Sequence, residues 1–312
     1  MKKYVFLLAI LIIAGKLAAQ KTDSLKKSNA ADSLLNSMSS DSKKEPVTVF
    51  KSSRLILSQT TETVKKKNFN FDIIHRFGDF SGTNGGARFA YGLDDVADVT
   101  FRFEYGLSDN LNIDLERSTI SGLIALELKY AILHQTADGS NPIAITVLGE
   151  TGVRPFGSFD TFDSRLSYFA QAIFAHRFSS GFSLQVSPSY VTSNTPYPAI
   201  NGIKQQFVSI SAAARVKLSN HMGFIVDYAH PFSAYRDNGV NRFSDPFGFG
   251  IEMITGGHVF TVNITNARAN SEINYLNNTM SDYARGQYRI GFTISRMFDF
   301  NHKESYKTAG GN

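Results

Sequence analysis

Apolar and polar residues alternate with a period of two along most of the chain from about residue 63 onward. The stretch VTFRFEYG at 99–106, for example, sets Phe101 and Phe103 against Arg102 and Glu104. Because successive side chains of a β-strand point to opposite faces, each such run predicts a strand with one apolar and one polar face. About twelve runs recur, centred near residues 72, 102, 114, 128, 148, 171, 187, 212, 228, 251, 262 and 293.

The lengths of the runs and of their connections favour a membrane barrel over a soluble sandwich. Many runs extend over about 9 to 13 residues, whereas ordinary strands have five or six. Tight turns such as 179–181 and 255–257 nearly alternate with long connections such as 78–97 and 267–286. Only the joins near 119–121 and 135–142 break this order. The pattern predicts an all-β fold, a transmembrane antiparallel β-barrel of about 12 strands with short periplasmic turns and longer outer loops.

The final run, RGQYRIGFTISRMFDF at 285–300, shows what the two faces meet. Its even positions carry Tyr288, Ile290, Phe292 and Ile294, and its odd positions carry Arg289, Gly291, Thr293 and Ser295. In a barrel the even positions face lipid and the odd positions face the lumen. The aromatic end, at Phe298 or Phe300, suits the interfacial girdle of such a protein.

The two ends of the chain have a different composition. Residues 1–20 combine MKK with a short apolar run and small residues near Ala19, which predicts a cleaved signal peptide. Residues 21–49 are rich in Ser, Lys, Asp and Asn and are expected to form a flexible periplasmic tether. The barrel is expected over 50–300 and a disordered tail over 301–312. The chain has no cysteine, so no disulfide or thiolate metal site is expected.

The candidate site consists of the charged residues at the alternate strand positions that are expected to face the lumen. The net charge is only +5, which gives no basic patch for nucleic acid. The lumen-facing candidates are Arg102, Glu104, Asp114, Glu116, Glu127, Lys129, Arg177, Arg215, Asp227, Glu252 and Arg289. With Arg165, Lys217 and Glu150 added, basic and acidic residues balance at seven each. Such balance predicts paired charges that fill a narrow lumen, or else a weakly selective constriction or a binding site for a small polar solute.

The sequence gives weaker support for a metal, cofactor or catalytic site. Asp94, Asp95 and Asp98 lie beside Gly92, but turns that start a strand explain them without calcium. The tripeptide HRF occurs at 75–77 and again at 176–178, where interfacial anchoring is expected rather than a shared metal. No nucleophile motif, cofactor motif or metal signature is present, so neither an enzyme nor a cofactor or metal is expected.

Several stretches are similar to those of a known family. The matching stretches are HRFG (75–78), YGLDDVADVTFRFEYGLSDNLNI (91–113), ERS (116–118), LKYAIL (128–133), FAHRFSSGFSLQVSPSY (174–190), TGGHVFTVNITNA (255–267) and IGFTISRMF (290–298). They resemble a domain-of-unknown-function family of bacterial outer-membrane β-barrel proteins. The resemblance implies a barrel fold with no settled activity and no catalytic residues. Family members often carry a tryptophan shortly before the last strand, where this chain has Tyr283.

These observations lead to one functional hypothesis with two alternatives. The hypothesis is an outer-membrane barrel that forms a narrow passive channel, or a binding barrel, for a small polar solute. The first alternative is a closed structural barrel whose tether or loops bind a periplasmic or surface protein partner. The second is a hydrolase at the barrel rim. The expected surroundings are outer-membrane lipid, and no nucleic acid is expected as a partner.

Overall fold

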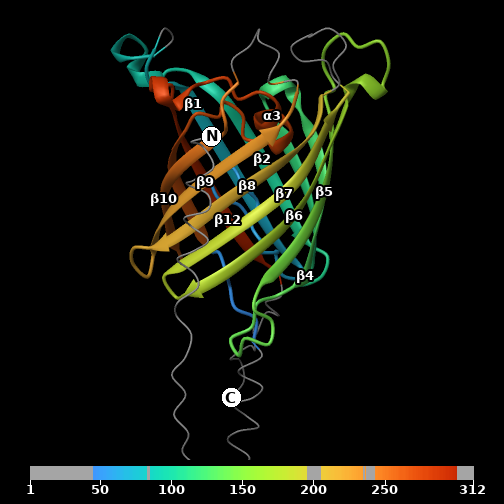
Figure 1. Ribbon diagram of the computed structural model, residues 1–312, viewed down its shortest axis with the longest axis vertical. Helices are drawn as coiled ribbons and strands as arrows, with labels where there is room; N and C mark the ends of the chain where they lie inside the picture. The colour runs from blue at the N-terminus through green and yellow to red at the C-terminus, as the bar shows by residue number, and fades with distance from the viewer. Residues whose placement is uncertain (1–44, 83–84, 195–204, 235, 237–242, 301–312) are drawn as a thin grey trace, which may run out of the picture. The chain divides into compact units, whose positions relative to one another are not determined.

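The described residues form a closed barrel of twelve antiparallel strands, in which β1 pairs with β12 (Figure 1). The computed structural model describes residues 45–82, 85–194, 205–234, 236 and 243–300. The predicted signal peptide, most of the predicted tether and the predicted tail lie outside these residues. The structure confirms the predicted fold class and its strand number.

The strands follow one another around the barrel in chain order. They are β1 (Asn68–Asp79), β2 (Val96–Gly106), β3 (Leu111–Ser118), β4 (Ile124–Leu133), β5 (Ala144–Val153), β6 (Leu166–Ser179), β7 (Phe182–Ser193), β8 (Gln205–Lys217), β9 (Met222–Phe232), β10 (Phe247–Thr255), β11 (His258–Thr265) and β12 (Arg289–Asp299). The described helices are short: η2 (Ala87–Gly92), η3 (Ile120–Gly122), η4 (Asp163–Arg165), α3 (Glu272–Asn277) and η5 (Tyr283–Arg285). In the described part of the chain, no helix is long and apolar enough to cross a membrane.

The connections sort to the two ends of the barrel largely as predicted. One end, called here the short-turn end, carries the connections 107–110, 134–143, 180–181, 218–221 and 256–257. The opposite, long-loop end carries 80–95, 119–123, 154–165, 233–246 and 266–288 among others. The two joins that break the pattern, 119–123 and 134–143, are those that the sequence indicated. β1 begins and β12 ends at the short-turn end, which is the periplasmic side of such a barrel.

β4 illustrates how alternation separates the two faces of the wall. Leu126 and Leu128 on its outer face are each 51% exposed, whereas Glu127 and Lys129 on its inner face are at most 4% exposed. An exposed apolar face is stable where lipid covers it, and the barrel leaves no sheet edge unpaired. On this strand the polar face therefore lines the interior.

The interior is occupied by residues 45–67, which precede β1 and form what we call the luminal hairpin. At the short-turn end, Pro46 forms a β-bridge with Thr136. The chain then turns where the Leu55 amide donates to the Ser58 carbonyl at 2.9 Å. It returns to the short-turn end, where the Lys67 amide donates 2.9 Å to Gly106. All residues from 53 to 61 are buried.

Apolar side chains hold the luminal hairpin against one half of the wall. Phe50, Leu55, Ile56 and Leu57 are each at most 2% exposed. They belong to one apolar cluster with inward side chains of β5 to β9, namely Leu148, Phe169, Ile173, Val191, Phe207 and Ile225. Burying one such side chain stabilises a fold by about 1.5–3 kcal/mol. The barrel therefore has an internal hydrophobic core built around a segment that is not part of its wall.

The first strand lies where the first run of alternation was predicted, near residue 72, whereas the barrel domain was expected to begin at residue 50. β1 begins at Asn68, and the described residues before it, 45–67, form the luminal hairpin. The physical reason is that residues 49–64 mix apolar runs such as Leu55–Leu57 with polar runs, instead of alternating. Such a segment suits an interior that is apolar on one side and charged on the other.

Candidate functional site

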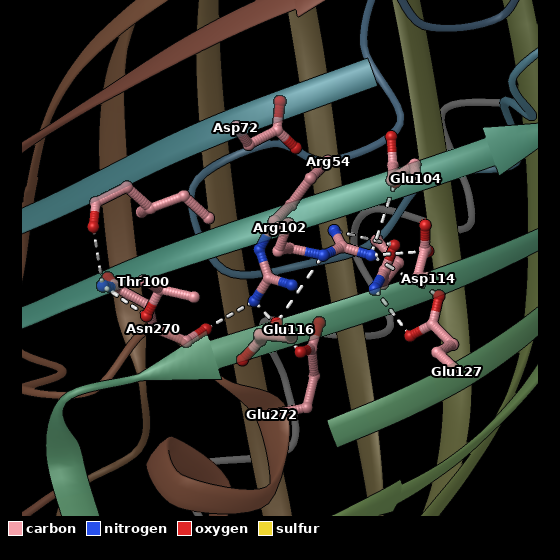
Figure 2. Close-up of polar contacts among 12 residues, drawn as sticks. Arg54, Asp72, Thr100, Arg102, Glu104, Asp114, Glu116, Glu127, Asn270 and Glu272 are labelled. Carbon is pink, nitrogen blue, oxygen red and sulfur yellow. Dashed lines mark hydrogen bonds and ion pairs between the residues drawn. The ribbon is translucent and has the colours of Figure 1, made fainter. Parts of the chain in front are cut away.

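Arg102 lies at the centre of a buried charged cluster on the inner face of β2, β3 and β4 (Figure 2). Its guanidinium nitrogens contact four carboxylates, at 2.9 Å from Asp114, 3.4 Å from Glu104, 3.5 Å from Glu127 and 3.6 Å from Glu116. All five side chains are at most 7% exposed. One cation thus neutralises part of a surrounding excess of acid.

Strand register explains why so many carboxylates meet at this place. Asp114 pairs directly with Glu104 on one side and with Glu127 on the other, and Glu127 pairs with Glu150 on β5. Inward-facing acids therefore stand side by side on four consecutive strands. Like charges directly across a ladder destabilise a sheet, so this arrangement requires compensation by cations and hydrogen-bond donors.

The luminal hairpin supplies part of that compensation. The Ser53 hydroxyl donates to Glu104 at 2.6 Å, and the Gln59 amide donates to Glu127 at 2.8 Å. The Lys129 ammonium in turn donates 3.2 Å to the Ser53 carbonyl. The hairpin therefore touches the charged half of the wall through polar groups, whereas it packs against the other half through apolar side chains.

A second ion pair joins the luminal hairpin to the connection between β11 and β12. Arg54 Nη2 lies 3.0 Å from Glu272 Oε2, and it also donates 2.5 Å to the Asn270 carbonyl. Glu272 belongs to α3, all six residues of which are buried. Burial raises the pKa of Glu272 above its ordinary value, although the charges of Arg54 and Arg102 act in the opposite direction. The hairpin thus meets a segment that folds in from the long-loop end.

Asp227 on β9 caps the tip of the luminal hairpin. Its carboxylate accepts hydrogen bonds from the amides of Ile56, Leu57 and Ser58, at 2.9, 3.3 and 3.2 Å. An inward carboxylate that satisfies three backbone donors fixes the position of a turn, because buried amides are costly when unpaired. The sequence placed Asp227 in the lumen but gave no sign of this role.

The remaining predicted residues lie away from the Arg102 cluster. Arg215 pairs with Glu252 at 2.6 Å, and Arg289 pairs with Asp79 at 2.5 Å. Arg177 is only half-buried near the short-turn end, where it donates 3.2 Å to the Thr48 carbonyl of the luminal hairpin. Of the three residues added by parity, Glu150 is buried beside Glu127, Lys217 is exposed and Arg165 lies in η4 rather than in a strand. Some of the predicted lumen-facing residues therefore form one cluster, and the others make separate contacts elsewhere.

The expectation for Arg76 as an interfacial anchor is wrong. Arg76 is 0% exposed and donates 3.1 Å to the Ala267 carbonyl, whereas its neighbour His75 faces outward and stacks on Phe292 with ring centroids 5.2 Å apart. The reason is that the even-numbered residues of β1 face inward, so Arg76 shares the buried face of the strand with Asp72 and Ile74. Alternation within HRF itself would have shown that His75 and Arg76 point to opposite sides.

Two carboxylates at the long-loop end bear on the calcium site and the rim hydrolase considered from the sequence. Asp98 is fully buried and accepts from the hydroxyls of Ser118 and Thr119, at 2.8 and 2.9 Å. In the described residues, no three His, Asp or Glu side chains are arranged to hold a metal ion. His230 lies 2.8 Å from Asp245, but Tyr228 and Arg236 also donate to that carboxylate, so the contact ties a loop together.

Comparison with known proteins places the barrel in a family. A family model described as "Membrane bound beta barrel domain (DUF5777)" matches residues 50–298. No curated protein sequence shows significant similarity to the chain.

Among solved structures, the NanC porin is 9% identical with a TM-score of 0.46, covering 73% of this chain and 98% of its own. An outer-membrane channel from Pseudomonas putida F1 is also 9% identical with a TM-score of 0.46, covering 76% and 98%. The KdgM porin in complex with a disordered oligogalacturonate is 7% identical with a TM-score of 0.45, covering 73% and 99%. Likenesses this distant carry no functional argument.

Proposed function

Since the chain belongs to the DUF5777 family of membrane-bound β-barrel domains, we propose that it is an outer-membrane barrel that passes a small polar solute through a narrow lumen, and that the luminal hairpin closes this lumen. The observation that carries the proposal is the hairpin itself. It enters and leaves at the short-turn end, and it fills an interior whose wall is largely polar. Release of this segment would open the lumen, so the docked and the released hairpin would correspond to a closed and an open state.

The inner face of β7 and β8 supports a polar passage. Beside the apolar Val191 and Phe207, its inward residues include a strip of small or uncharged polar side chains, namely Ser183, Gln185, Ser187, Ser189, Ser209 and Ser211. Ser187 stands opposite Ser211, and Ser189 opposite Ser209. The hydroxyls of Ser187, Ser209 and Ser211 have no hydrogen-bond partner among the described residues. Small hydroxyl groups without partners are costly in a dry core. They are well suited to hydrogen bonding with water or with a passing polar solute.

A second candidate is a permanently closed barrel that binds a protein partner through its tether or loops. The observation that favours it is the internal hydrophobic core, because withdrawing Phe50, Leu55, Ile56 and Leu57 exposes apolar surface. The two candidates differ in one measurable respect. A gated channel conducts when the luminal hairpin is free or absent, whereas a closed barrel conducts in neither case.

The absence of cysteine allows a direct test. Pro46 and Thr136 are β-bridge partners, so replacing both with cysteine brings two thiols within disulfide reach. We expect discrete conductance steps in planar bilayers from the reduced protein and silence from the oxidised protein, with Pro46→Cys alone insensitive to oxidation. A chain lacking residues 45–66 should conduct under both conditions. Silence from that folded barrel would overturn the channel and favour the closed barrel.

A further inference from the structure

The connection between β11 and β12 folds back into the barrel, and its inner part, residues 266–279, is called here the luminal loop. All residues of this loop are buried except Arg268 and Asn278. The loop includes α3, which contacts β6, β7 and β9. In the ring of strands β6 and β7 lie opposite β12 and β1, so the luminal loop crosses the lumen instead of lying over its rim.

The wall of the barrel supports the luminal loop independently of the luminal hairpin. The backbone amide of Asn270 donates 2.9 Å to Asp98 on β2, and its side-chain amide donates 3.2 Å to the Thr100 hydroxyl. Farther along the loop, Arg154, which follows β5, donates 3.3 Å to the side-chain carbonyl of Asn274. Because these contacts involve no residue of the hairpin, they remain available when the hairpin is released.

One side of α3 lies against the luminal hairpin. The carboxylate of Glu272 lies 3.0 Å from the guanidinium of Arg54 (Figure 2). The hydroxyl of Tyr275 donates 3.2 Å to the backbone carbonyl of Leu57. Residues three apart lie on the same side of a helix, so Glu272 and Tyr275 together form the surface that α3 presents to the hairpin.

Another side of α3 borders a different space. Asn274 and Asn277, again three residues apart, contribute to the lining of a cavity of about 420 Å³ at the long-loop end. None of the described residues that line this cavity belongs to the luminal hairpin. The helix therefore stands between the space that the hairpin fills and the cavity at the long-loop end. A solute that crosses the barrel has to pass beside it.

We infer that the luminal loop is the constriction of the opened channel, and that Glu272 and Tyr275 determine which solutes pass it. When the luminal hairpin leaves, both side chains lose their partners in the hairpin and border the vacated space. A carboxylate and a phenol at the narrowest point favour small cations and neutral solutes that form hydrogen bonds, and they disfavour anions. This inference deepens the proposed function and rests on it for conduction.

Proteolysis tests whether the luminal loop keeps its place without the hairpin. Chymotrypsin cleaves after aromatic residues, and the β11–β12 connection offers Tyr275, which is 1% exposed, and Tyr283, which is 40% exposed. We expect cleavage after Tyr283 but not after Tyr275, both in the full mature chain and in the chain lacking residues 45–66, with the fragments identified by mass spectrometry. Cleavage after the two tyrosines at equal rates in the chain lacking the hairpin would overturn the inference.

Conductance of the chain lacking residues 45–66 tests the charge at the constriction. In a potassium chloride gradient, Glu272→Gln should shift the reversal potential of this chain toward zero, because the constriction loses its carboxylate. Asp163→Asn is the matched control and should leave the reversal potential unchanged, because Asp163 is an exposed carboxylate in the β5–β6 connection. Equal shifts in the two variants, or no shift in either, would overturn the assignment of Glu272.

The width of the constriction is tested in the same chain. Tyr275→Ala removes a buried ring that borders the vacated space, so it should raise the single-channel conductance and admit larger polyethylene glycols. Tyr283→Ala removes an exposed ring from the same connection and should change neither. The same conductance in both variants would mean that the luminal loop does not limit passage. If the chain lacking the hairpin does not fold, Arg54→Gln in the full mature chain, which loosens the hairpin, replaces it in each measurement.

The channel and the constriction fail separately in these experiments. If the folded chain without residues 45–66 is silent while Tyr275 stays protected, the channel proposal fails and the luminal loop stands as a barrier of its own. If that chain conducts while Tyr275 is cleaved, or while the substitutions behave like their controls, the channel stands and the constriction fails.

Discussion

The guanidinium of Arg54 and the carboxylate of Glu272 lie 3.0 Å apart, and their side chains are 3% and 1% exposed. Arg54 belongs to the luminal hairpin, which enters from the short-turn end, and Glu272 belongs to α3, which folds in from the long-loop end. Two segments that enter from opposite ends therefore meet through one buried ion pair. Because removing one partner leaves an uncompensated buried charge, this pair is sensitive to single substitutions.

Replacing Arg54 with glutamine should loosen the luminal hairpin. The change leaves Glu272 buried without its cation, at a cost of up to about 3–5 kcal/mol. We expect faster proteolysis within residues 45–67 in the intact, membrane-embedded barrel and more frequent conductance steps. The double variant Arg54→Gln with Glu272→Gln should recover much of the loss, because no charge is then left unpaired. Identical proteolysis of wild type and Arg54→Gln would show that the pair does not hold the hairpin.

The free energy of unfolding should fall as the pH rises. Burial raises the pKa of Glu272, so between its ordinary pKa and the raised value the folded state holds a proton that the unfolded chain releases. The state that binds more protons is favoured at low pH, and its advantage is lost as the pH rises through the raised pKa. Urea unfolding in detergent across this interval should show a free energy of unfolding that decreases with pH. Glu272→Gln, which cannot titrate, should remove that component, and an unchanged pH profile in this variant would assign the dependence to other groups.

Arg102 should be the most destabilising single substitution in the charged half of the wall. Arg102→Gln leaves four contacting carboxylates without their shared cation, and breaking a buried ion pair typically costs about 3–5 kcal/mol. Urea unfolding in detergent, followed by circular dichroism, measures the loss. Lys217→Gln, at the exposed end of β8, is the control and should change the free energy of unfolding by less than about 0.5 kcal/mol.

The opened barrel should prefer cations. Balanced charges along the sequence predicted weak selectivity, but the structure gathers acids on one side of the wall, with Glu150 directly beside Glu127. Without the luminal hairpin, Arg54 is absent and that side carries a clear excess of carboxylates. The reversal potential of the barrel lacking residues 45–66, in a potassium chloride gradient, should show a permeability ratio for potassium over chloride well above unity. Glu150→Gln should lower this ratio. A ratio of one in both proteins would restore the interpretation of balanced charge.

Gly106 offers a way to disturb the luminal hairpin without touching charge. A β-carbon at this position would lie 2.1 Å from the Lys65 carbonyl oxygen, so the return arm of the hairpin must move if Gly106 becomes alanine. Gly149 also lies within a strand, and a β-carbon there has no neighbour within 4 Å. We expect Gly106→Ala to increase channel openings and Gly149→Ala to leave them unchanged. Equal behaviour of the two variants would mean that the return arm adapts at no cost.

Period-two alternation was sufficient to predict the wall but not its contents. The centres of the predicted runs near 128 and 187 fall at the middle of β4 and β7, because alternation is imposed on every residue between lipid and lumen. Parity also placed Arg102 and Asp114 inside. It could not show that Asp114 faces both Glu104 and Glu127, because register depends on turn geometry.

The luminal hairpin escaped prediction for a different reason. It satisfies its backbone with side chains such as Asp227 and packs in an environment of its own, so no periodic constraint marks its sequence. The available signal was the apolar run at Leu55–Leu57 beside the polar stretch SQTTET, which suits neither a lipid-facing strand nor a solvated tether. An apolar run that breaks the alternation just before the first strand therefore deserves consideration as an internal segment.

The path of the luminal hairpin has a consequence for how the molecule assembles. Within the described residues, its two arms pass through the same mouth, near Thr136 and Gly106, so this segment is not threaded from one mouth to the other. The ladder between β1 and β12 contains no residue of the hairpin, so the wall can close without it. We therefore expect insertion into the membrane and sealing of the interior by the hairpin to be separable steps.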